Sequence, residues 1–121
     1  MAKWSNDSVM DAALDKIATG VTITVTSQQP ANRTEAVTTY KLATRTVTGA
    51  AYTKANGDIS GRKVTIAQQD NILVDTTGTA THIAISDGTN LLYVTTCTSQ
   101  LLTAGNTITI PAWKAEFADP S

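Results

Sequence analysis

Apolar and polar residues alternate strictly in several segments of the chain, and threonine fills most of the polar positions. VTITVT at 21–26 is the longest such segment, and TITI at 107–110 repeats the pattern. Successive side chains of a strand point to opposite faces of a sheet, and β-branched residues favour that conformation. The alternation therefore predicts strands with one buried face of valine and isoleucine and one wet, uncharged face of threonine.

The first twenty residues follow a helical pattern instead. Their apolar residues recur on one face of a helix, at Val9, Met10, Ala13, Leu14 and Ile17. Ser5 can cap this helix, Trp4 can pack onto Val9 as a hydrophobic staple, and Gly20 can end the helix in a left-handed conformation. We predict one helix within about residues 5–19, with its apolar stripe packed against a sheet.

The rest of the chain, from 21 to about 118, has the pattern of a β domain. Alternating segments predict strands at about 21–27, 43–47, 62–68, 71–75, 79–86, 91–98 and 106–118. Residues 34–42 fit either a strand or a short helical turn that Thr34 caps. Residues 48–61, interrupted by three glycines, are expected to form a long connection.

Two local features define the end of this region. Asp87-Gly88 lies between two alternating segments and predicts a β-hairpin there. Trp113 and Ala115 have the opposite parity to Ile108 and Ile110, so a bulge or bend at 111–112 is needed to return both pairs to the core. Six or more short strands with such turns predict an antiparallel β-sandwich, jelly-roll-like, in a single domain spanning 1–121.

Composition limits the classes of partner. The net charge is −1 and the basic residues are scattered, so nucleic acid is not expected as a partner. No apolar run approaches 18 residues and the N-terminus is polar, so neither a membrane span nor a signal peptide is expected. Only 16% of residues are charged, below the roughly 25% of typical domains. Such a surface fits either a threonine-rich monomer or a subunit of an assembly.

Chemistry-bearing residues are sparse. His82 is the single histidine and Cys97 the single cysteine, which cannot supply the three or four ligands of a zinc site. No nucleophile elbow surrounds His82, and Cys97 is expected to be a buried small hydrophobe. The sequence predicts no catalytic residues, no metal and no cofactor. Stacking of a sugar on Tyr52 or Trp113 remains an alternative.

Two segments carry a resemblance to a known group of proteins. They are GTATHIAISD at 78–87, followed by LLY at 91–93, and LLTAGNTITIPA at 101–112. Together with the opening MAKW and the QP…TEAVTTY segment at 29–40, they resemble small virion structural proteins of tailed bacteriophages, some of which are tail-fibre-like. In those proteins a Thr-His strand precedes a Leu-Leu strand, and an Ala-Gly-Asn-Thr strand ending in Ile-Pro-Ala closes the sheet.

The resemblance implies a capsid decoration (cement) protein, which binds the outer surface of the head and bridges coat subunits. Its implied partners are the major capsid protein and further copies of itself, as a dimer or trimer on the shell, after synthesis in the host cytoplasm. The alternative is a tail or fibre component, a receptor-binding module that recognises glycans. Candidate partner contacts are Trp4, Gln29, Arg33, Tyr52, Asn56, Glu116 and Phe117.

Overall fold

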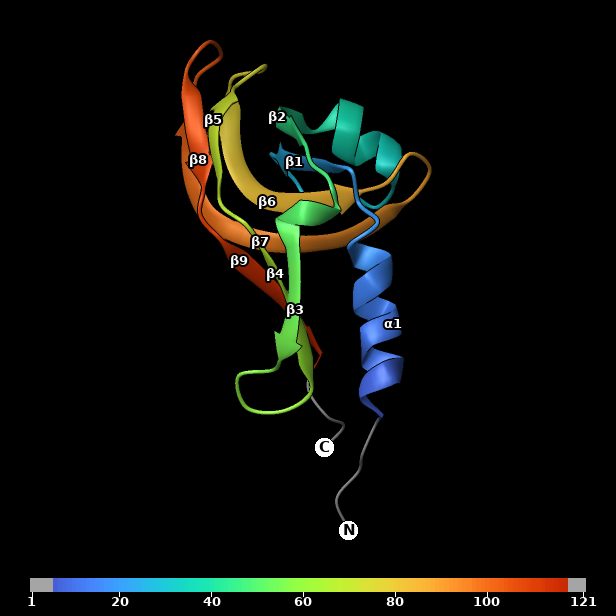
Figure 1. The fold of residues 1–121 in the computed structure, drawn as a ribbon. Coiled ribbons are helices and arrows are strands. Elements are labelled where there is room, and N and C mark those ends of the chain that lie inside the picture. The colour runs from blue at the N-terminus through green and yellow to red at the C-terminus, as the bar shows by residue number, and fades with distance from the viewer. Residues whose placement is uncertain (1–5, 118–121) are drawn as a thin grey trace.

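A computed structural model describes residues 6–117 of the chain (Figure 1). One helix and nine strands follow in this order, with two short helical turns between them: α1 (Asp7–Ile17), β1 (Thr22–Thr26), η1 (Glu35–Thr39), β2 (Lys41–Thr46), η2 (Gly49–Ala51), β3 (Tyr52–Asn56), β4 (Arg62–Ile66), β5 (Gln69–Leu73), β6 (Gly78–Ser86), β7 (Leu91–Leu102), β8 (Thr107–Ile110) and β9 (Trp113–Phe117). The protein is mainly β, as the sequence predicted.

The strands form antiparallel sheets with a sandwich-like arrangement. A four-stranded sheet has the order β2-β1-β6-β7, a three-stranded sheet has the order β3-β4-β9, and β5 pairs with β8. The predicted hairpin is present, since β6 and β7 pair on either side of Asp87-Gly88. The predicted bend is also present: β8 ends at Ile110, β9 begins at Trp113, and the two strands pair with β5 and β4 respectively.

Helix α1 packs its buried side into the core between the sheets, which confirms the predicted docking. Leu14 is fully buried and Met10 and Ile17 nearly so, but Val9 is 63% exposed and Ala13 is exposed. The stripe is therefore narrower than the sequence suggested. Ion pairs fix the helix to the β3–β4 hairpin, with 2.8 Å from Arg62 Nε to Asp11 Oδ1.

The helix lies within the predicted range, but both predicted capping residues were wrong. Asn6, not Ser5, is the N-cap, and its side chain accepts a hydrogen bond from the Ser8 N–H. The helix ends at Ala18 in a right-handed conformation, so Gly20 does not end it in a left-handed one. Gly20 instead permits a close approach, because a Cβ there would lie 2.2 Å from Cγ2 of Ile85. The staple by Trp4 lies outside the described residues.

Strand β1 does not have the wet face that the alternation predicted. Thr24 and Thr26 are fully buried, like their neighbours Ile23 and Val25. Strand β1 lies inside its sheet, and η1 covers the face opposite the core (Figure 1). Two buried hydroxyls on this side, those of Thr24 and Ser86, have no hydrogen-bond partner among the described residues.

Two connections also differ from expectation. Residues 34–42 contain both a helical turn, η1, and the start of β2, and the turn is capped by Asn32, which accepts from the Glu35 N–H at 2.9 Å. The side chain of Thr34 makes no capping hydrogen bond. The stretch 48–61 is not a long connection, because it contains β3, which pairs with β4 across the glycine-containing turn.

Candidate functional site

The wall of strands around the core is almost continuous. From β7 it runs through β6 and β1 to β2, and a bridge between Ala43 and Val74 then links β2 to the β5–β8 pair. The Asp75 N–H donates to the Leu42 carbonyl at 2.8 Å and strengthens that link. Within residues 6–117, no backbone hydrogen bond closes the remaining gap between β7 and β8. We call this gap the seam.

An irregularity in β7 borders the seam. Ala80 of β6 pairs with Gln100, yet His82 pairs with Thr96, so three residues of β7 lie opposite Thr81 alone. Extra residues in one strand bend it and increase its twist. Strands β6 and β7 curve sharply together beside β8 (Figure 1). The bend places residues 97–102 of β7 along one side of the seam.

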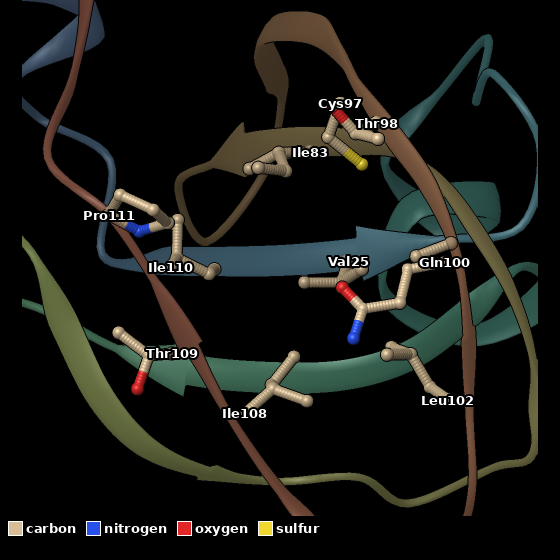
Figure 2. Close-up of a pocket in the computed structure, with 11 residues that line it drawn as sticks. Val25, Ile83, Cys97, Thr98, Gln100, Leu102, Ile108, Thr109, Ile110 and Pro111 are labelled. Atoms are coloured by element: carbon tan, nitrogen blue, oxygen red, sulfur yellow. The ribbon is translucent and has the colours of Figure 1, made fainter.

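The seam is an open cleft of about 380 Å³ with an apolar lining. Its lining residues are Val25, Ala80, Ile83, Cys97, Thr98, Gln100, Leu102, Ile108, Thr109, Ile110 and Pro111. Figure 2 shows β7 and β8 on its two sides, Val25 on its floor, and the amide of Gln100 reaching inward. A cleft of this size with few polar groups is typical of binding sites.

A second hollow of about 240 Å³ continues the seam along β9. It shares four lining residues with the first and adds five more, which are Thr95, Thr96, Ala112, Trp113 and the charged Lys114. The ring of Trp113 stacks on Tyr93 of β7, with 6.1 Å between the ring centroids. The indole N–H of Trp113 is buried and has no hydrogen-bond partner among the described residues.

Charge is distributed unevenly over the six strands that form sheet edges in the described chain. Strands β2, β3, β5 and β9 each carry at least one charged residue. Strands β7 and β8, which flank the seam, carry none. Proteins protect free edges with charges, prolines, bulges or short strands. Strand β8 is short, but β7 has twelve residues and only its bulge for protection.

Cys97 lies at the junction of the two hollows and is half-buried rather than buried as expected. Burial raises the pKa of its thiol above the ordinary value. A thiol that stays protonated at neutral pH is a poor nucleophile. Cys97 therefore has the environment of a lining residue. Because it is the single cysteine of the chain, its slow reaction with an excess of a thiol reagent can still report on access to the seam.

The sequence-based candidate contacts lie elsewhere. Asn56, Glu116 and Phe117 meet at one end of the three-stranded sheet, where Arg62 pairs with both Asn56 and Phe117. Glu116 accepts from the Asp58 N–H at 2.8 Å, and Phe117 is 38% exposed.

The remaining candidates do not join this group. Gln29 is exposed in the connection after β1, and Arg33 donates from Nε to the Asp87 carbonyl at 2.8 Å. Tyr52 is half-buried and donates its hydroxyl to the Gly20 carbonyl at 2.9 Å. Trp4 lies outside the described residues. The seam was not among the sequence-based predictions, although residues 91–113 contain no charged residue and so give a signal of it in the sequence.

Groups that could perform acid–base chemistry are engaged in local structure. Nδ1 of His82 lies 2.8 Å from the Thr81 hydroxyl. Hydrogen bonds from the backbone of Asn90 and Thr89 hold the pKa of Asp87 below its ordinary value, which makes this carboxylate a turn cap. Among the described residues, no group of three or more histidine, cysteine or acidic side chains could hold a metal ion.

No helix in the described part of the chain is long and apolar enough to cross a membrane. Comparison of the chain with protein-family models finds no match. Comparison with curated proteins and with solved structures finds none either.

Proposed function

We propose that this chain is a non-catalytic structural protein of a tailed-phage virion, a capsid decoration protein that binds the outer head surface and stabilises contacts between coat subunits. The observation that carries the proposal is the twelve-residue, charge-free edge of β7 beside the open seam. A free edge of this kind invites pairing with another chain. Neighbouring proteins in an assembly can cover this edge. The resemblance of residues 78–112 to phage virion proteins favours the virion as that assembly.

Decoration would act through contact area. A specific interface buries roughly 800 Å² on each partner, and many copies on one shell add avidity. A surface with few charges lowers the cost of such burial, because unpaired charges at an interface are heavily penalised. The low charge content and the neutral lining of the main cleft of the seam both fit this mode of binding.

The copy number of the chain in purified particles tests the proposal. Quantitative mass spectrometry of intact virions, compared with tail-less heads, should find this chain in the heads in numbers comparable to the coat protein. Removing it should lower the temperature at which heads release their genome. A handful of copies per particle, all lost with the tails, would refute the decoration role.

That refuting result would support a tail or fibre module that binds glycans. The alternative relied on Tyr52 or Trp113 as a stacking surface. The Tyr52 hydroxyl donates a hydrogen bond to the Gly20 carbonyl, and the ring of Trp113 is stacked on Tyr93. Because these contacts occupy part of each side chain, we favour the decoration role. Adsorption to host cells that is lost on Trp113→Ala would reverse this preference.

A further inference from the structure

We infer that the seam binds one extended, uncharged segment of a different protein by strand addition, so that the segment fills the gap between β7 and β8. The identification of that different protein as a neighbouring virion protein rests on the proposed function. Strand addition itself rests on the two free edges and on the lining of the cleft.

The first argument concerns the backbone. In an antiparallel pair, alternate residues direct their N–H and C=O groups away from the partner strand. Strand β7 pairs only with β6 and strand β8 only with β5 in residues 6–117, so both present free groups toward the seam. A strand placed between them can hydrogen-bond on both sides, as in other cases of β-augmentation.

The second argument concerns side chains. The eleven lining residues of the main cleft include no charged residue, and Val25, Leu102 and Ile108 are among its apolar ones. A charged side chain entering this lining would lose its hydration without gaining a partner. The occupant therefore has apolar side chains at the alternate positions that face inward. The amide of Gln100 can hydrogen-bond to the occupant's backbone.

The length of the flanking strands limits the occupant. Strand β8 has 4 residues, and residues 97–102 of β7 lie opposite it across the cleft. At about 3.4 Å per residue, the occupant has about four to six residues in contact.

A second copy of this chain is a poor donor. Segments with the right pattern are already paired within their own copy, β1 on both sides and β8 with β5. A copy that inserted its β1 into another copy's seam would lose the hydrogen bonds of β1 to β2 and β6 and would gain only a similar number. It would also expose its own core. A different protein with a free extended arm has no such cost, and the inference is therefore restricted to it.

The test uses the full chain and the synthetic peptide acetyl-Asn-Thr-Val-Thr-Ile-Thr-Asn-amide, with Cys97 as reporter. Cys97 is the single cysteine and lines the seam. The peptide should slow the reaction of the Cys97 thiol with an aromatic disulfide reagent at least tenfold, and the slowing should saturate as the peptide concentration rises. It should also shift the amide NMR signals of β7 and β8. A peptide with proline at the central threonine, which lacks a needed N–H, should do neither.

A pair of variants supplies the matched control. Gln100→Lys places a charge at the seam, and Gln68→Lys places the same charge at another exposed site. Gln100→Lys should weaken peptide binding at least tenfold, whereas Gln68→Lys should leave it unchanged. Both variants should keep the wild-type circular dichroism spectrum, because both side chains are exposed.

Four results for the reaction of the Cys97 thiol would overturn the inference. The first is no slowing at millimolar peptide, and the second is equal slowing by the proline peptide. The third is slowing by an alkyl glucoside but not by the peptide, and the fourth is slowing that depends only on protein concentration. The third would indicate a small-molecule site and the fourth a second copy. If the chain is absent from heads but the peptide binds, the virion role fails and strand addition stands. If the chain is abundant in heads but the peptide does not bind, strand addition alone fails.

Discussion

The docking of α1 gives the sharpest test of the fold, because two residues of one predicted stripe have opposite environments. Leu14 is fully buried in the core, whereas Val9, five residues earlier on the same helix, is 63% exposed. Replacing each by alanine removes apolar carbon atoms from the same element. Leu14→Ala removes three carbon atoms and Val9→Ala removes two, but the main difference is the packing around the lost atoms.

The expected magnitudes are well separated. Leu14→Ala removes three carbon atoms at about 0.8 kcal/mol each, or about 2.4 kcal/mol, and the cavity that remains adds up to about 2 kcal/mol more. For Val9→Ala, the small loss of burial is offset by the higher helix propensity of alanine, and the net change should be within about 0.5 kcal/mol.

Urea unfolding followed by tryptophan fluorescence and by circular dichroism measures both changes. The slope of the transition should be the same in the wild type and in both variants. A loss below about 1 kcal/mol for Leu14→Ala, or equal losses for the two variants, would mean that α1 does not dock in the isolated protein. The helix would then need a partner in order to pack.

Three further predictions concern other parts of the fold. Burial raises the pKa of Tyr52 from 10.0 to about 12, so the unfolded chain loses the phenolic proton first and stability should fall as the pH rises from about 10 to about 12. Tyr52→Phe should remove this fall in urea titrations across that range. Gly20→Ala forces a Cβ against the buried Ile85 and should cost about 1–3 kcal/mol, measured from the thermal midpoint. Asn6→Ala removes the helix cap and should cost about 1 kcal/mol in the same assay, with no change in the slope of urea unfolding.

Local patterns predicted most of the secondary structure because they depend on neighbouring residues. The alternation at 22–26 identified β1, and the parity change at Pro111 identified the break between β8 and β9. The burial of Thr24 and Thr26 was not predictable in the same way. It depends on η1, which begins nine residues after Thr26 and covers the second face of the strand.

The seam was missed because it depends on pairing between strands. Alternation can identify β7 and β8 as strands, but it cannot show that neither pairs with the other. The candidate contacts were chosen in loops and termini, and three of them do converge at Asn56, Glu116 and Phe117. The one charged member of that group, Glu116, pairs with Lys114 at 3.9 Å, and Lys63 pairs with Asp58 beside it at 2.6 Å, so the charges there are satisfied within the chain.

The distribution of charge gives these observations a common physical basis. Most of the ion pairs among residues 6–117 fix α1 to the β3–β4 hairpin or surround the turn at Asp58, and two others join Lys16 to Asp87 and Lys41 to Asp75, so they act within the fold itself. The edges of β7 and β8 contain no charge, and the only feature of β7 that discourages pairing is its bulge opposite Thr81. That bulge also bends β7 beside the seam. The same irregularity therefore limits unwanted pairing along β7 and shapes a cleft that a suitable strand can enter.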